Sequence, residues 1–221
     1  INIMNMENNG KLEAVTLKKV ISGVPFVGQK INAENYREKG FDSLKEAEYW
    51  SNRSCGAVCL EIALRAISPD SKISLQKIIE IGLKKGAHEE RVGWIHQGLV
   101  DMAKEIGLFA GKESVGTDLI KIKNHLEKNE IVIASVSHGF DVGKVYKLDD
   151  GSDYVVPRGG HLIVIFGFSE ENGKIKSFFV HHPSHYKSYE WENYELSAGD
   201  FLKSFSEKGN IIFVSKQNEE K

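Results

Sequence analysis

Cysteine and proline are both scarce in this chain, whose 221 residues include two cysteines and four prolines. Cys55 and Cys59 stand one helical turn apart, and a disulfide framework needs more cysteines at wider spacing. Acidic and basic residues almost balance, at a formal net charge of −2, so nothing indicates nucleic acid or an anionic membrane as an obligatory partner. No apolar run approaches the length of a membrane-spanning helix.

The length fits one domain of ordinary size, which can bury a core without disulfides. We expect a flexible N-terminal arm over residues 1–18, a single domain over 19–216 and a solvated tail over 217–221. The chain begins with Ile1, so a removed signal peptide is compatible with the sequence. The compartment and the oligomeric state stay open.

Apolar periodicity predicts helices in the first half of the chain and strands in the second. A short strand is expected over 20–29, followed by a polar connection with some helical character. Ser74 is a plausible N-cap, and Gly86 and Gly107 are plausible helix stops. Helices first and antiparallel strands afterwards indicate one α+β domain. The expected helices start at Cys55 and cover 74–85, 94–107, 117–129 and 200–205; the expected strands cover 131–137, 161–168, 176–183 and 210–216, with a hairpin over 143–157.

Three short motifs carry residues suited to nucleophilic catalysis. Cys55 and Gly56 stand at a helix start, where the helix dipole and free N–H groups favour a thiolate. A nucleophilic thiol needs a nearby base, and that base needs a third group to orient it. His161, after two glycines, opens one strand, and His182, before Pro183, ends the next. In an antiparallel hairpin both histidines reach the same edge of the sheet.

Together these motifs resemble the papain-like cysteine peptidases, and in particular the bacteriocin-processing leader-peptidase family, peptidase family C39, with its stand-alone relatives. The likeness lies in a Cys-Gly pair before an apolar helix and in a Gly-His pair opening an apolar strand that ends at Gly167-Phe168. The likeness also includes His182, which precedes Pro183 at the end of the next strand, and the segment "VPFVGQ" over residues 24–29. It spans roughly residues 20–214.

The resemblance implies a papain-like fold and hydrolysis of peptide or amide bonds, without a metal or cofactor. It makes Cys55 the nucleophile, His161 the general base and acid, and His182 the third member of the triad. The family usually has Asp or Asn where His182 stands, and a neutral imidazole lacks the charge that stabilises an imidazolium. For the oxyanion, Gln29 matches by motif and Asn52 lies nearer in sequence. Asp141 and Asp153 are conceivable substitutes for the third member.

Other functions remain open at this stage. The same thiol could pass its acyl group to an amine, as a thiol acyltransferase does, or the site could be a catalytically weakened peptide-binding module. A zinc site built from Cys55, Cys59 and two C-terminal histidines fits poorly, because Cys59 would face the core. The expected partner is a peptide or protein substrate, and the expected setting is soluble, in the bacterial cytoplasm or secreted.

Several further residues are assigned to the core or the surface. Cys59 is expected in the core, since free cysteine is among the most buried residue types. Trp50, Tyr49 and Trp94 are interpreted as core aromatic residues, with a substrate-groove wall as the alternative for the first two. The remaining histidines are expected to be at the surface (His181 and His185) or in solvated or core positions unrelated to the site (His88, His96, His125 and His138).

Overall fold

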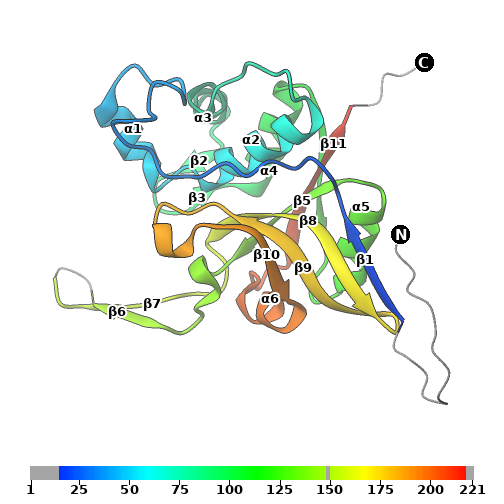
Figure 1. Cartoon of the computed structure of the whole chain (residues 1–221). Coiled ribbons are helices and arrows are strands. Elements are labelled where there is room, and N and C mark those ends of the chain that lie inside the picture. The colour runs from blue at the N-terminus through cyan, green and yellow to red at the C-terminus, as the bar shows by residue number, and fades with distance from the viewer. Residues whose placement is uncertain (1–14, 148–149, 218–221) are drawn as a thin grey trace, which may run out of the picture.

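The computed structural model describes residues 15–147 and 150–217, and it consists of helices packed on both faces of one large sheet (Figure 1). No helix among these residues is long and apolar enough to cross a membrane. The helices are α1 (Leu44–Ser51), α2 (Cys55–Ile67), α3 (Leu75–Lys84), α4 (His96–Glu105), α5 (Leu119–Glu127) and α6 (Ala198–Ser204), with short 3-10 turns η1 (His138–Phe140) and η2 (Lys187–Tyr189).

The main sheet has the order β10-β9-β8-β5-β11-β4, and β1 also pairs with β8. Every pairing in it is antiparallel, as the sequence predicts. Two small hairpins, β2–β3 and β6–β7, stand apart from it. The strands are β1 (Thr16–Val20), β2 (His88–Glu89), β3 (Gly93–Trp94), β4 (Leu108–Ser114), β5 (Ile131–Val136), β6 (Val145–Lys147), β7 (Asp153–Val155), β8 (His161–Glu171), β9 (Lys174–His182), β10 (Trp191–Ser197) and β11 (Asn210–Lys216).

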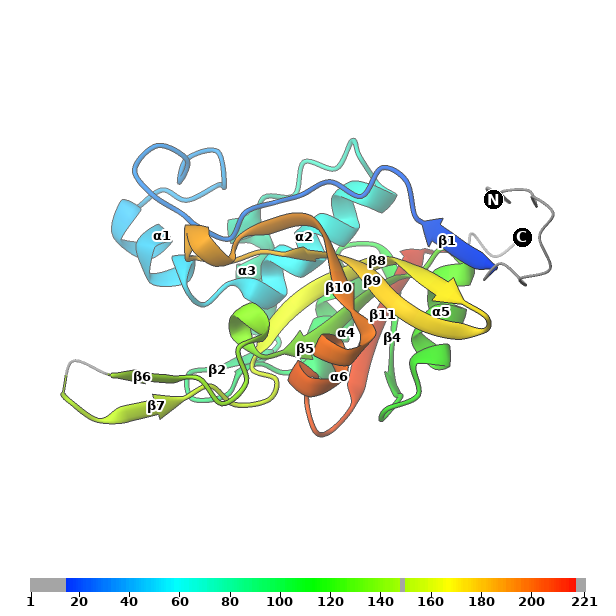
Figure 2. The same ribbon diagram turned by 60° about the horizontal axis from the view of Figure 1, so that its bottom comes forward.

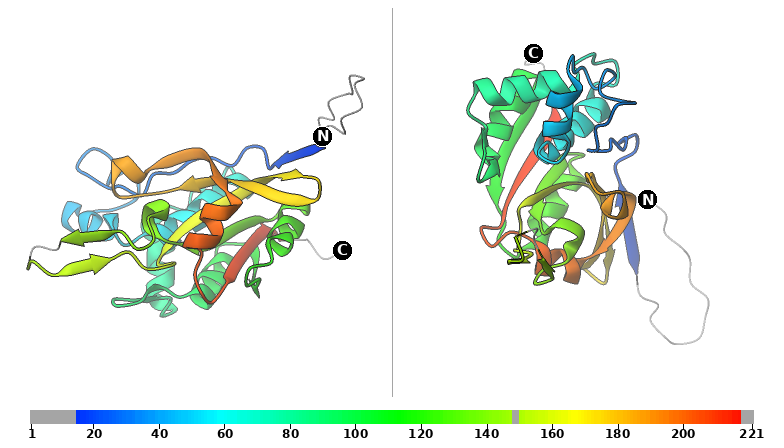
Figure 3. Two further views of the ribbon diagram at one scale, coloured as in Figure 1. Left: turned by 90° about the horizontal axis from the view of Figure 1, so that it is seen from below. Right: turned by 90° about the vertical axis from the view of Figure 1, so that its left-hand side faces the viewer.

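The sheet separates two buried apolar clusters, because alternate residues of a strand point to opposite faces. Leu162 and Val164 of β8 pack with residues of α1 to α4, whereas Ile163 and Ile165 pack with residues of α5 and α6. Figure 1 and the right-hand view of Figure 3 show α1 to α4 gathered on one side of the sheet. Helix α2 packs directly on β8, so the strand that starts at His161 lies beneath the helix that starts at Cys55.

Local capping explains where the predicted helices begin and end. Ser74 accepts a hydrogen bond from the N–H of Lys77 at the start of α3, and Asp118 accepts one from Ile120 at the start of α5. Gly86, just past α3, has a φ of 63°, which lies in the left-handed region that glycine tolerates best. These boundaries confirm the helices expected from Cys55 onward.

The N-terminal expectation is wrong in part. The strand predicted over 20–29 has only Val20 in common with β1, which instead covers residues assigned to the flexible arm. Gly167 allows this pairing, because a Cβ there would lie 2.6 Å from the carbonyl oxygen of Lys19. Most of the expected arm, residues 1–14, and the tail residues 218–221 lie outside the described residues.

The β6–β7 hairpin extends away from the body of the molecule, as Figure 2 shows. Its strands pair only with each other within the described part of the chain, in the register Val145 to Val155 and Lys147 to Asp153. All six strand residues are exposed. The hairpin predicted over 143–157 is therefore confirmed, although it belongs to a separate two-stranded sheet.

Candidate active site

Cys55 is the first residue of α2, and its side chain is partly buried against the start of β8. Burial raises the pKa of the Cys55 thiol above its ordinary value. The backbone N–H groups of Leu162, Gly56 and Cys55 itself act in the opposite direction. The helix start therefore favours the thiolate as the sequence predicts, but the cost of burying the charge outweighs it, and the thiol is neutral at rest.

Gly56 follows the thiol because Trp94 occupies the space that a side chain would need. A Cβ on Gly56 would lie 2.6 Å from Cγ of Trp94, far inside contact distance. The Trp94 indole donates through Nε1 to the carbonyl oxygen of Arg53, at 2.7 Å, in the turn before α2. Trp94 is buried as expected, but it lies in β3, before α4 begins. Packing against Trp94 therefore explains why a glycine follows the cysteine in the Cys-Gly motif.

His161 and His182 lie together, as the hairpin argument predicts. Their rings stack with centroids 4.4 Å apart and planes 26° from parallel. His138 joins them, with its ring centroid 4.8 Å from that of His161 and 5.4 Å from that of His182. One ring nitrogen from each of the three histidines lies within 4.8 Å of the other two. This group, called the histidine cluster below, contains neither cysteine.

The two glycines before His161 form the turn that starts β8. Gly159 and Gly160 have φ values of 76° and 93°, a conformation that L side chains rarely adopt. The N–H of Gly160 donates to Oγ of Ser135, at 3.0 Å, and the N–H of Gly159 donates to the carbonyl oxygen of Ser204, at 2.9 Å. These bonds fix the backbone position from which His161 extends.

The strand register brings His138 to the cluster. Val136, the last residue of β5, pairs with His161, so the chain leaves β5 beside the start of β8. The N–H of Gly139 then donates to Nε2 of His182, at 3.2 Å. His138 itself bonds through Nε2 to Oγ of Ser184, at 2.9 Å. The sequence interpretation of His138 as unrelated to the site was wrong.

Burial lowers the pKa of all three histidines in the cluster. The pKa of His161 lies well below its ordinary value. Burial is the largest cause, and the charges that His182 and His138 would carry lower the pKa further. Burial also lowers the pKa of His182 to about 3, and it lowers that of His138. The three rings are therefore neutral at neutral pH. Nε2 of His161 and Nδ1 of His182 are both buried without a hydrogen-bond partner.

The thiol and the imidazole are not hydrogen-bonded to each other in this structure. Nε2 of His161 has no hydrogen-bond partner, and the thiol meets the backbone N–H of Leu162. Leu162 belongs to the apolar cluster on the α2 side, whereas the His161 ring stacks on His182. Cys55 and His161 thus lie at the same strand start without a hydrogen bond between them.

The two oxyanion candidates differ in their surroundings. Gln29 is buried, at 2% exposure, and its Oε1 has no hydrogen-bond partner. Asn52 is exposed at the C-cap of α1, where its Oδ1 accepts a hydrogen bond from Nη1 of Arg53, at 2.7 Å. Only the amide nitrogen of either side chain can donate to an oxyanion, so the unpaired Oε1 does not support this role, and the burial of Gln29 is what distinguishes it from the exposed Asn52.

Neither aspartate considered as a third triad member contacts His161. Oδ2 of Asp141 accepts hydrogen bonds from Nζ of Lys144, at 3.0 Å, and from the hydroxyl of Tyr189, at 2.9 Å. Asp153 lies in the β6–β7 hairpin, where it pairs with Lys147 at 2.5 Å. His182 therefore remains the candidate for the third position.

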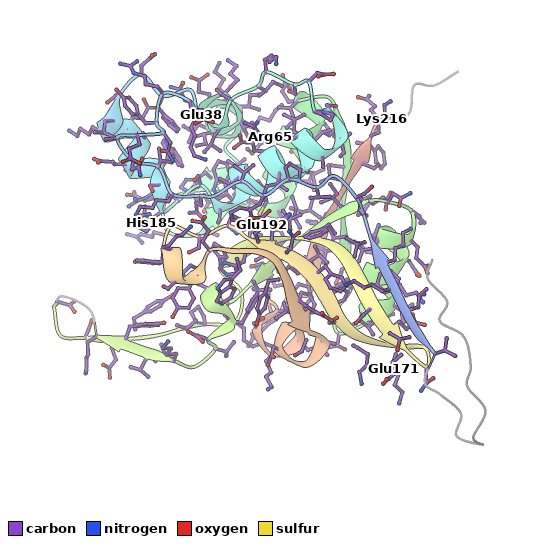
Figure 4. All side chains as sticks on the ribbon, in the orientation of Figure 1. Glu38, Arg65, Glu171, His185, Glu192 and Lys216 are labelled. Carbon is purple, nitrogen blue, oxygen red and sulfur yellow. The ribbon has the colours of Figure 1, made fainter. Side chains whose placement is uncertain are left out.

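Five other sequence assignments can be compared with the structure. His181 is fully buried and stacks on Phe166 with centroids 4.4 Å apart, so its assignment to the surface was wrong. His185, which is labelled in Figure 4, is partly buried, and its Nδ1 lies 3.0 Å from Oγ of Ser51. Tyr49 is 44% exposed rather than core, whereas the core assignments of Trp50 and Cys59 are confirmed.

Known structures share this architecture. A protein from Bacillus anthracis described as a C39-like peptidase superposes with a TM-score of 0.56 at 14% sequence identity, over 92% of this chain and 100% of that one. The chain has the papain-like fold of C39-like peptidases. At this identity the likeness concerns the fold alone. The sequence itself matches no protein-family model, and no curated protein matches it.

Two further structures of this kind align over less of the chain. The peptidase domain of Streptococcus ComA, a bi-functional ABC transporter involved in quorum sensing, aligns at 18% identity over 75% of this chain and 93% of that one, with a TM-score of 0.49. A double-glycine-motif protease from a transporter, in complex with its leader peptide, aligns at 17% identity over 74% and 86%, with a TM-score of 0.45.

Proposed function

We propose that this protein is a cysteine peptidase in which Cys55 is the nucleophile and His161 the general base and acid. The observation that carries the proposal is the position of the thiol: at the start of α2, against the backbone of the residue that follows His161, within a C39-like fold. The thiol lies against the backbone N–H of Leu162, the residue next to His161, and the proposed pair forms when the His161 side chain rotates toward the thiol. Catalytic hydrogen bonds are often long or misaligned without substrate.

In the proposed reaction, the neutral His161 ring takes the Cys55 proton as sulfur attacks the carbonyl carbon of a peptide bond. The carbonyl oxygen gains the negative charge, with Gln29 and the N–H of Cys55 as donors. The imidazolium then gives its proton to the leaving amine as the C–N bond breaks. A water, deprotonated by His161, splits the acyl-enzyme and returns the thiol to Cys55. His182 is the proposed positioning residue for His161.

The direct test is cleavage of an unbiased peptide mixture, read by mass spectrometry in the presence of a chelator. Wild type is expected to cleave a defined set of bonds, and Cys55→Ala is expected to cleave none. Cys59→Ala, which removes the other thiol from the same helix, is the matched control and should retain the wild-type products. Cleavage that persists in Cys55→Ala would contradict the proposal. An added amine would reveal acyl transfer by the appearance of amide products.

Two observations favour a second candidate, a peptide-binding module without catalysis. The thiol and the imidazole are not hydrogen-bonded in the resting structure, and His182 replaces the usual Asp or Asn. This candidate predicts that peptides bind to wild type and to Cys55→Ala with equal affinity and that neither protein cleaves them.

A further inference from the structure

His138 has no part in the proposed peptidase reaction, yet it completes a compact group of three histidines. His161 and His182 are 7% and 0% exposed, so these rings are almost removed from water. One nitrogen from each of the three rings lies within 4.8 Å of the other two. Nε2 of His161 is buried without a hydrogen-bond partner. Buried polar atoms are almost always paired, so an unpaired nitrogen in this cluster calls for an explanation.

The donor set identifies the kind of ligand. Neutral imidazole is a ligand for zinc and other first-row transition metals, and three histidines with an open fourth position form a common zinc arrangement. No carboxylate belongs to the group among the described residues, so the set does not suit calcium or magnesium, which need oxygen ligands. With Zn–N bonds of about 2.0–2.1 Å, ligand nitrogens lie about 3.4 Å apart, so small side-chain rotations would close the cluster around an ion.

Outer contacts hold two of the rings in place. Oγ of Ser184 lies 2.9 Å from Nε2 of His138, and metal-binding histidines commonly have such a partner on the second ring nitrogen. The N–H of Gly139 donates to Nε2 of His182, which marks Nε2 as the nitrogen with the lone pair in the neutral ring. A metal ion can take the place of that hydrogen bond.

Aromatic side chains surround the cluster. Phe140 meets the His182 ring edge-on, with centroids 5.2 Å apart, and Trp191 lies 5.1 Å from the same ring. Tyr189 lies 5.0 Å from His138. These aromatic rings limit access of water to the cluster.

We propose that His138, His161 and His182 together bind one divalent first-row transition-metal ion, of which Zn²⁺ is the representative. The site also regulates the enzyme, an extension that rests on the proposed peptidase function. His161 cannot ligate the ion and serve Cys55 at once, because the metal takes the lone pair that would accept the thiol proton. A bound ion therefore holds His161 in the cluster and blocks catalysis, and removal of the ion releases it.

The binding claim is tested by titrating Zn²⁺ into tag-free, chelator-stripped full-length protein and measuring heat by calorimetry. Wild type is expected to bind one equivalent, and His138→Gln is expected to bind at least about tenfold more weakly. His96→Gln, which removes a histidine outside the cluster, is the matched control and should bind as wild type does. Equal affinity in His138→Gln and wild type, or no binding to wild type, would overturn the site.

Two further measurements test the metal ligands without relying on the His138→Gln variant, which could fold poorly. X-ray absorption of the wild-type zinc complex should show nitrogen and oxygen ligands and no sulfur, and a Zn–S distance of about 2.3 Å would exclude the three-histidine set. Cys55→Ala should bind Zn²⁺ as tightly as wild type does, and loss of binding there would likewise overturn the assignment.

A separate experiment tests the regulation. Peptide cleavage by the wild-type protein is measured once with chelator and once with one equivalent of Zn²⁺, and the two rates are compared. We expect cleavage in chelator and its loss with zinc, whereas undiminished cleavage by the zinc-loaded enzyme would refute the regulatory claim. Zinc binding without cleavage in either condition would refute the proposed peptidase function and leave the metal site established. The two claims therefore fail in distinguishable ways.

Discussion

At the scale of single residues, the candidate site depends on a few imidazole nitrogens. His182, which the resemblance predicts at the third triad position next to Pro183, is fully buried. Burial lowers its pKa to about 3, so it faces His161 as a neutral ring. A neutral ring can orient His161, but it gives little support to the positive charge that His161 acquires during proton transfer.

Substitution of His182 by aspartate tests this reading. In His182→Asp we expect the pKa of His161 to rise by about one unit or more, because a nearby carboxylate stabilises the imidazolium. The measurement is an NMR titration of the His161 ring protons in wild type and variant, with chelator present. His182→Asn, which keeps the size of the substituent without its charge, is the control. An equal shift in both variants would show that the carboxylate charge is not the cause.

The sequence predicts only part of this site. Cys55, His161 and His182 stand in motifs whose order suggests proximity, and the structure brings the two histidines together. His138 follows its strand without any motif of its own. It reaches the cluster because Val136 pairs with His161, and strand register depends on long-range packing that the sequence pattern does not reveal.

At the scale of elements, the packing of α2 on its neighbours sets the position of the nucleophile. Residues 56–64 of α2 are all buried, and Trp94 packs against the helix at Gly56. The thiol is thereby held at the junction of the helical layer and β8. Any side chain that pushes α2 away from Trp94 moves Cys55 as well.

Replacement of Gly56 by alanine is expected to destabilise the protein by about 1–3 kcal/mol, since the new Cβ would overlap the rigid Trp94 ring. Urea denaturation followed by tryptophan fluorescence measures this. Gly199→Ala is the control, because Gly199 lies in α6 with its nearest neighbour 3.8 Å from an added Cβ. A helical alanine with free space should be neutral or slightly stabilising. Equal stabilities of the two variants would contradict the packing argument.

The elements that sequence patterns predict well are those with strong local signals. Helices α3 and α5 have side-chain N-caps, and β5 is wholly buried and rich in β-branched residues. β10 was missed because six of its seven residues are at least partly exposed, so it shows little apolar alternation. β1 was missed for the same reason: it is a polar edge strand without a buried residue. β1 and β10 are strands because they pair with neighbouring strands of the sheet, and not because of a local sequence pattern.

At the scale of the whole molecule, the projecting β6–β7 hairpin lies outside the buried interior that stabilises the fold. Two apolar clusters on opposite faces of the sheet form the buried interior, and the β6–β7 hairpin belongs to neither. Its link to the body includes an exposed hydrogen bond, 2.8 Å long, between the hydroxyls of Tyr146 and Tyr189. The fold therefore does not depend on the hairpin.

Replacing residues 146–154 by two glycines should accordingly change the melting temperature by less than about 2 °C. Phe168→Ala, at a fully buried position, is the contrasting variant and should lose about 3–5 kcal/mol of folding free energy. Calorimetric or circular-dichroism melting curves give both values. A drop of about 5 °C or more in the hairpin variant would show that the hairpin supports the core.

The central claim is that Cys55 and His161 act as a pair, and it is tested most directly by the rate at which iodoacetamide alkylates Cys55. The rate is measured from pH 5 to 10 in chelator-treated wild type and His161→Ala, with His96→Ala as control. Because burial raises the Cys55 pKa, we expect half-maximal reactivity in wild type above about 8.5. At pH 7 we expect a reaction about tenfold or more slower in His161→Ala, where the base is missing. Equal rates in His161→Ala, His96→Ala and wild type would contradict the account.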